Sequence, residues 1–173
     1  MIGLKAVTTA NLTFQHIENT DLGRIDNFVK LVHNPVLDSG STYSRISTLW
    51  YDSYNLNGVQ THNLISLQRN IYNKAIDVGF GGGNIKGINV QNSGNNILNV
   101  GLPFDGCSGN IIVGSGGAFL FSNLEGYFVD NGHKTIVIDH SAGISRINIA
   151  VVGCGSGISS ACGFSSGFSN GFC

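Results

Sequence analysis

Hydrophobic residues occur along this chain in short runs, which are interrupted every few positions by Gly, Asn, Asp or Ser. Short runs rich in Val, Ile, Thr and aromatic residues are typical of β-strands, whereas the interrupting residues favour turns. The pattern therefore predicts an all-β protein. The predicted strands are residues 4–7, 11–14, 27–32, 45–50, 63–67, 74–78, 84–90, 95–100, 110–113, 118–121, 126–129, 134–138 and 144–152. Residues 21–32 are the one segment whose apolar spacing also fits a helix.

Several of these segments resemble one another. Residues 63–70 are similar to residues 84–92 at an offset of 21 or 22 positions, and Ile88, Ile111 and Ile136 are separated by 23 and 25 residues. A repeat of this length is typical of a β-solenoid, in which short parallel strands stack into coils. We expect such a stack from residue 42 to residue 138, with Ile65, Ile88, Ile97, Ile111 and Ile136 pointing inward. An antiparallel β-sandwich or jelly roll is the alternative, because it also contains many short strands.

The last part of the chain has a different composition. No charged side chain follows Arg146, and Phe164, Phe168 and Phe172 recur at intervals of four residues in a Gly/Ser-rich background. Regularly spaced exposed phenylalanines would promote aggregation of a monomer. We therefore expect residues 1–146 to form the body and residues 147–173 to form an oligomerisation segment. A disordered low-complexity tail is the alternative.

The charge of the chain excludes several classes of function. Charged residues make up 11% of the sequence and the net charge is −1, so the chain lacks the basic field that nucleic acid requires. No apolar run reaches the length of a membrane span. The five histidines are scattered without metal-ligand spacing, and we expect neither a metal nor a cofactor. The abundant neutral polar residues suit a neutral or glycan ligand.

The cysteines are unevenly distributed. Cys107 stands alone, whereas Cys154, Cys162 and Cys173 fall within the last 20 residues. The absence of C-x-x-C spacing argues against a zinc ribbon or a redox motif. Free thiols are the expectation, and disulfides to Cys107 or between subunits are the alternatives.

The short coils punctuated by Asn and Gly, the low charge and the apolar C-terminal segment resemble the C-terminal portion of a bacteriophage tailspike. The resemblance covers residues 42–173 and is to the group with a pectate-lyase-like right-handed parallel β-helix. It implies a homotrimer in the phage tail of the virion, assembled in the host cytoplasm. It also implies a bacterial surface polysaccharide as ligand and, often, a glycosidase or lyase activity. The alternatives are a non-catalytic trimerisation module of a fibre and a monomeric β-sandwich carbohydrate-binding domain.

One segment concentrates residues suited to sugar recognition: Trp50, Tyr51, Asp52, Tyr54 and Asn55 lie within six positions. Aromatic rings stack on the C–H faces of sugars, and carboxylates and amides bind the hydroxyl groups. On a strand, alternation would place Trp50 on the face opposite Tyr51. The alternative is that Trp50 belongs to the core.

Hydrolysis of a glycoside would require two carboxylates roughly 5–10 Å apart. Asp52 and Asp77 are 25 residues apart, about one period, and would meet on adjacent coils of a solenoid, about 4.8 Å apart. We therefore predict them as a catalytic pair, with Arg69 and Tyr72 as further substrate-binding residues. Solvated turn residues are the alternative interpretation of such spacings.

Overall fold

The computed structural model describes residues 5–7, 9–20, 23–39, 45–71, 74–104, 110–140 and 143–155. This part of the chain is all-β and contains no helix. No helix in it is therefore long and apolar enough to cross a membrane. Residues 23–32, for which a helix was an alternative, lie within a strand.

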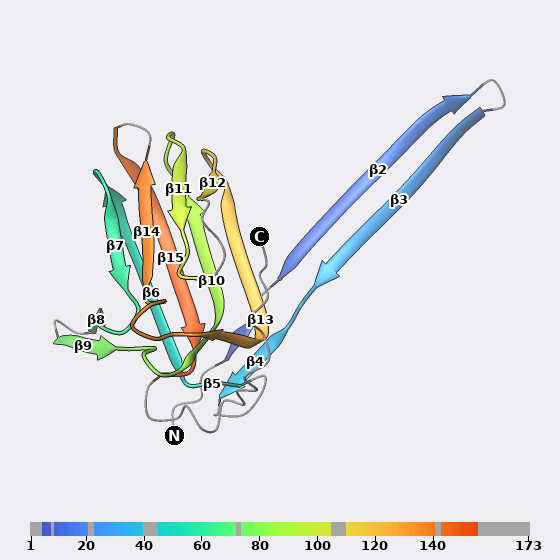
Figure 1. Cartoon of the computed structure of the whole chain (residues 1–173). Helices are drawn as coiled ribbons and strands as arrows, with labels where there is room; N and C mark the ends of the chain where they lie inside the picture. The colour runs from blue at the N-terminus through green and yellow to red at the C-terminus, as the bar shows by residue number, and fades with distance from the viewer. Residues whose placement is uncertain are drawn as a thin grey trace.

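Two four-stranded sheets form the body of the protein (Figure 1). The strand order of the first sheet is β13-β10-β15-β6 and that of the second is β12-β11-β14-β7. The first sheet contains β6 (Thr48–Leu56), β10 (Asn84–Asn92), β13 (Ala118–Phe128) and β15 (Ser145–Gly153). The second contains β7 (Gln60–Asn63), β11 (Leu98–Gly101), β12 (Ile111–Val113) and β14 (Thr135–His140).

The strand pairings of this sandwich are nested. Of the eight sandwich strands in chain order, the first pairs with the last, β6 with β15, and the second pairs with the second-last, β7 with β14. The two inner pairs are β10 with β13 and β11 with β12. Every one of these pairings is antiparallel. An eight-stranded double sheet with this order is a jelly roll.

The expectation of a parallel β-helix is therefore wrong, and the alternative of a β-sandwich or jelly roll describes the body. The apparent repeat has a simple cause: residues 63–70 begin at the end of β7 and run through a turn, whereas residues 84–92 are a single strand. Two segments of similar sequence therefore adopt different secondary structures. The only parallel pairing in the described residues is a short one between β4 (Val36–Ser39) and β5 (Arg45–Ile46).

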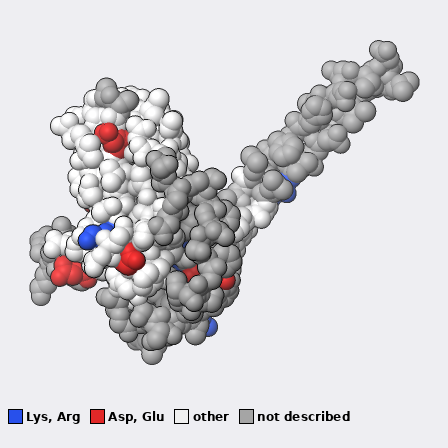
Figure 2. All heavy atoms as spheres, in the orientation of Figure 1, with Lys and Arg blue, Asp and Glu red and all other residues white. Residues whose placement is uncertain are grey.

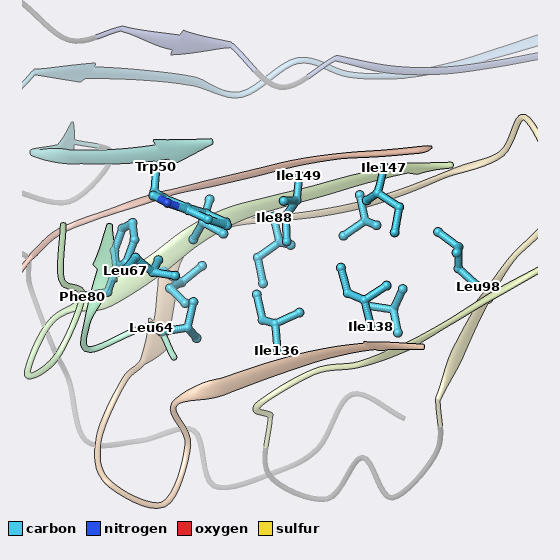
Figure 3. Close-up of a cluster of buried hydrophobic side chains, with 14 of the residues drawn as sticks. Trp50, Leu64, Leu67, Phe80, Ile88, Leu98, Ile136, Ile138, Ile147 and Ile149 are labelled. Carbon is cyan, nitrogen blue, oxygen red and sulfur yellow. The ribbon is translucent and has the colours of Figure 1, made fainter. Parts of the chain in front are cut away.

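The core lies between the two sheets. Figure 3 shows Ile88, Ile147 and Ile149 of the first sheet facing Ile136 and Ile138 of the second. Burial alternates along β15, so that Ile147, Ile149 and Val151 point inward. Each fully buried side chain of this size contributes about 1.5–3 kcal/mol to stability.

The expected inward isoleucines are partly confirmed. Ile88 and Ile136 are fully buried, and Ile65 and Ile111 pack against the core while remaining partly exposed. Ile97 is 49% exposed, because the core position beside it is taken by Leu98 at the start of β11.

The expected boundary at residues 146 and 147 falls inside β15, a central strand of the first sheet. Residues 147–153 are therefore part of the sandwich. The phenylalanines of residues 163–173 lie outside the described residues. Cys154, directly after β15, is buried and disulfide-bonded, so the expectation of free thiols is wrong for this residue. The other three cysteines lie outside the described residues.

A long two-stranded hairpin projects from the sandwich (Figure 1). It consists of β2 (Ala10–Thr20) and β3 (Gly23–His33), which pair without interruption from Ala10 and His33 to Thr20 and Gly23. At its base, β1 (Ala6–Val7) pairs with β4. A second, shorter hairpin of β8 (Leu67–Ile71) and β9 (Lys74–Val78) lies between β7 and β10 in the chain.

Candidate ligand-binding site

The aromatic segment predicted for sugar recognition forms most of β6, an edge strand of the first sheet. Alternation along the strand separates its aromatic residues as predicted. Trp50 and Tyr54 both contact the ring of His62 on β7, whereas Tyr51 is 53% exposed and lines a depression on the outer face of the sheet. The two sides of β6 therefore have different roles.

Trp50 is a core residue. It is 2% exposed, its ring centroid lies 5.0 Å from that of His62, and its indole N–H donates a 3.0 Å hydrogen bond to the backbone carbonyl of Gln68. Buried tryptophans usually find such a partner for the N–H group. The structure thus supports the alternative interpretation of Trp50, and the ring is not presented to a sugar.

Tyr54 and His62 form a neutral pair between the two sheets. The phenolic oxygen of Tyr54 lies 2.7 Å from Nε2 of His62. Burial, and secondarily the charge of Asp52, raise the pKa of Tyr54, so the phenol keeps its proton. Burial lowers the pKa of His62, and the opposing effect of Asp52 is smaller. At neutral pH both groups are therefore uncharged, and the tautomer of His62 determines which of the two donates the hydrogen bond.

The two carboxylates predicted as a catalytic pair have different surroundings. Asp52 is exposed on β6, where its Oδ1 accepts a 2.8 Å hydrogen bond from the backbone N–H of Ser53. Asp77 is on β9, where its Oδ1 lies 3.4 Å from Nε2 of Gln68. The stacked coils that would have brought the pair together do not exist in an antiparallel sandwich. Asp52 lies on an edge strand, where a charged side chain disfavours pairing with a strand of a second chain.

The remaining predicted residues are dispersed. Asn55 is exposed on β6, opposite Arg146 of β15. Arg69 is placed by its backbone on β8, opposite Ile76. Tyr72 lies outside the described residues. Asn55 is not among the described residues that line the outer depression.

The outer depression has a volume of about 570 Å³, within the usual range for small-ligand sites. Its floor is the outer face of the first sheet, and one side is formed by β1 and the residue Thr9. Residues from all four strands of the sheet contribute. They are Tyr51, Asp52, Ser53, Gly87, Ile88, Asn89, Gln91, Leu120, Asn148, Ile149, Ala150 and Val152.

The strand register arranges this face in rows. One row is polar and crosses three strands through Ser53, Asn148 and Gln91. The amide of Asn148 is fixed within it: Oδ1 accepts a 2.7 Å hydrogen bond from the hydroxyl of Ser53, and Nδ2 lies 3.3 Å from the hydroxyl of Ser93. The row thus presents oriented amide and hydroxyl groups without a net charge.

The neighbouring row combines an aromatic ring with a small residue. Tyr51 lies opposite Ala150, which in turn lies opposite Asn89. Because alanine has a short side chain, space remains between the tyrosine and the amide. The row therefore has an aromatic side, a shallow centre and a polar side, which are the elements of a site for a flat ligand with hydroxyl groups.

Charge is scarce around this site. Among the described residues that line the depression, Asp52 is the only charged one. Elsewhere on the molecule, Figure 2 shows few and scattered charged side chains among the described residues of the face turned to the viewer. Of these lining residues, Tyr51 and Asp52 were predicted from the sequence. Asn148 was not predicted, because the sequence shows only a polar residue between Ile147 and Ile149, as on many half-buried strands.

Comparisons of the chain with protein-family models, with curated proteins and with solved structures found no match. Within the described residues, no group of three or more His, Cys, Asp or Glu side chains is arranged to hold a metal ion. The interpretation of the depression thus rests on its own chemistry.

Proposed function

We propose that the protein is a jelly-roll carbohydrate-binding domain and that the outer depression binds a neutral glycan. The observation that carries this proposal is the pair of rows on the first sheet. Tyr51 offers an aromatic face beside the small Ala150, and the oriented groups of Ser53 and Asn148 offer donors and acceptors to sugar hydroxyls. Jelly rolls are common among lectins and viral capsid proteins.

For the wider context we propose what the resemblance to a tailspike implies. A bacterial surface polysaccharide is the proposed ligand, and a homotrimer in a phage tail is the proposed setting. The low charge and the abundance of neutral polar residues support this context. The proposed activity is binding, because Asp52 and Asp77 have separate partners and neither is placed against a second carboxylate in the described contacts.

The proposal is tested by binding of the purified protein to bacterial surface polysaccharides, measured by calorimetry. Tyr51→Ala should weaken binding by about 1–3 kcal/mol if the ring stacks on a sugar. Asn148→Ala should weaken it as well, because the row then loses the amide whose oxygen and nitrogen are both held by hydrogen bonds. Ile112→Ala is the control, since Ile112 is 70% exposed on the second sheet.

The result that contradicts the proposal is unchanged binding in a folded Tyr51→Ala protein. If both Tyr51→Ala and Ile112→Ala bind as the wild type does, the ligand occupies another surface. If no polysaccharide binds the wild-type protein, the proposed ligand class is wrong.

A specific observation favours assembly as a second role. The β2–β3 hairpin extends away from the sandwich (Figure 1), and a two-stranded hairpin in water is only marginally stable by itself. Packing against a neighbouring subunit would stabilise it. We therefore propose that this hairpin contributes to the predicted homotrimer.

A further inference from the structure

The dipeptide Asn-Gly occurs three times in the chain, at Asn57–Gly58, Asn131–Gly132 and Asn170–Gly171. In this dipeptide the backbone nitrogen of glycine can attack the side-chain amide of the preceding asparagine, since glycine has no side chain to shield it. The reaction converts asparagine into aspartate or isoaspartate. The third dipeptide lies outside the described residues, and the first two differ in what their glycine N–H groups contact.

Asn57 and Gly58 lie in the connection between β6 and β7, and both are exposed. Gly58 has a φ of +91°, which glycine adopts without strain. A Cβ atom built at this position would have no neighbour within 4 Å. The Cα atom of Gly58 therefore has open surroundings, next to the nitrogen that would attack the exposed Asn57 amide.

A base faces the attacking nitrogen. The backbone N–H of Gly58 donates a 2.7 Å hydrogen bond to Nε2 of His140, at the end of β14. Because Nε2 is the acceptor, the neutral imidazole carries its hydrogen on Nδ1. That Nδ1 atom is buried and has no hydrogen-bond partner among the residues that the structure describes. The basic lone pair of His140 is therefore directed at the proton that must leave Gly58 for the reaction to occur.

We propose that Asn57 is a self-modification site and that His140 is its general base. His140 takes the proton from the nitrogen of Gly58, which forms a bond to Cγ of Asn57. The bond from Cγ to the amide nitrogen breaks, and the proton held by His140 leaves with that nitrogen as ammonia. Water then opens the succinimide at either carbonyl, giving aspartate or isoaspartate and leaving His140 unchanged.

The second dipeptide provides a matched comparison in the same molecule. The N–H of Gly132 donates a 2.8 Å hydrogen bond to Oδ1 of Asp130, which also accepts hydrogen bonds from the backbone and the ring of His133. Burial opposes the effect of these bonds, but they hold the pKa of Asp130 below its usual value. This carboxylate is a weaker base than an imidazole, so Asn131 should react more slowly than Asn57.

The modification would alter the sandwich at a corner where the chain passes from the first sheet to the second. Isoaspartate adds a carbon atom to the backbone between β6 and β7, and either product adds a negative charge beside His140. The change would occur three residues from Tyr54, whose hydroxyl group is bonded to His62 on the other strand. Modified protein should therefore be less stable than fresh protein.

The experiment follows the folded full-length protein at neutral pH and 37 °C, with peptide mapping that separates asparagine, aspartate and isoaspartate. A positioned general base typically accelerates proton transfer by about 10²-fold or more. We expect Asn57 to react faster than Asn131 by on the order of tenfold. In urea, where neither His140 nor Asp130 is held in place, the two rates should become similar.

The variant His140→Gln tests the basic function alone. A glutamine oxygen can still accept a hydrogen bond from the N–H of Gly58, but it cannot take the proton. In this variant the rate at Asn57 should fall toward that at Asn131. Equal rates in the folded wild-type protein, or an Asn57 rate that persists in a folded His140→Gln protein, would overturn the proposal. Should that variant not fold, the comparison of the two sites in native buffer and in urea decides by itself.

Discussion

The hydroxyl group of Tyr54 and Nε2 of His62 are 2.7 Å apart, and they join an edge strand of one sheet to an edge strand of the other. Both residues come from the corner of the jelly roll where β6 passes into β7. The ring of Trp50 lies against the same imidazole. The inward-facing side chains of β6, which was predicted as a sugar site, therefore connect the two sheets at one edge of the sandwich.

The first prediction concerns the pH dependence of stability. Burial lowers the pKa of His62 below its ordinary value of 6.5, so the unfolded chain takes up a proton there before the folded protein does. The free energy of unfolding should hold its full value above about pH 6.5 and decrease as the pH falls toward the lowered pKa. Urea denaturation at several pH values measures this decrease.

His62→Asn is the matched variant, because an amide can also form a hydrogen bond with Tyr54 but does not titrate in this range. Its loss of stability on acidification should be smaller than that of the wild type. An equal loss in both proteins would assign the effect to other groups.

A second prediction concerns Trp50. Trp50→Ala should lower the free energy of unfolding by about 3–5 kcal/mol, because it opens a cavity in the core and leaves the carbonyl of Gln68 without its donor. Thermal denaturation followed by circular dichroism checks this. Trp50→Phe should cost less, and Ile112→Ala, at an exposed position, should cost little. A neutral effect of Trp50→Ala would mean that the ring is not in the core.

The third prediction concerns close backbone packing at the end of β15. A Cβ atom on Gly153 would collide with the backbone carbonyl oxygen of Asn84 on β10, which cannot move without distorting the strand. Gly153→Ala should therefore destabilise the protein by about 1–3 kcal/mol, as overpacked sites do. Gly114→Ala is the control, because a Cβ atom there would have no neighbour within 4 Å. Equal melting temperatures for the two variants would contradict the close contact.

The fourth prediction concerns assembly. Val7 pairs with Val36 at the base of the projecting hairpin, so a short glycine linker can replace residues 10–33 without disturbing that pairing. The shortened protein should keep the melting transition of the sandwich but lose the trimer, as measured by mass in native buffer. A protein lacking residues 163–173 is the companion variant, because the sequence predicts these residues as an oligomerisation segment. If the trimer persists without the hairpin, residues 163–173 or another surface must hold the subunits together.

The sequence predicted many of the strands but not their arrangement, and the predicted strand at residues 63–67 is mostly a turn. The runs at residues 84–90, 134–138 and 144–152 correspond to β10, β14 and β15 because each has clear apolar residues and turn residues on both sides. Whether such strands pair in parallel or antiparallel fashion depends on contacts between distant segments, such as Ser53 with Asn148, which local pattern does not encode. The similar spacing of Ile88, Ile111 and Ile136 therefore supported the wrong topology.

The same limit applies to the site. Alternation correctly separated Trp50 from Tyr51, but which of the two aromatic residues faced the core depended on the sheet that covers β6. Asn148 and Asn89 became part of the depression only because β15 lies between β6 and β10. An amide on a strand has no sequence signal that distinguishes a ligand-binding side from an ordinary solvated one.

The nested order of the jelly roll also determines when the protein can fold during its synthesis. The β6 strand emerges from the ribosome early, yet its ladder partner is β15, with Ser53 bonded to Asn148 95 residues later. Contacts of such long sequence separation form slowly, and a domain built from them cannot close while its last strand is still in the exit tunnel. Until residue 153 has been released, β6 remains an unpaired edge, so chaperone occupancy during translation should be high and should fall abruptly once β15 is free.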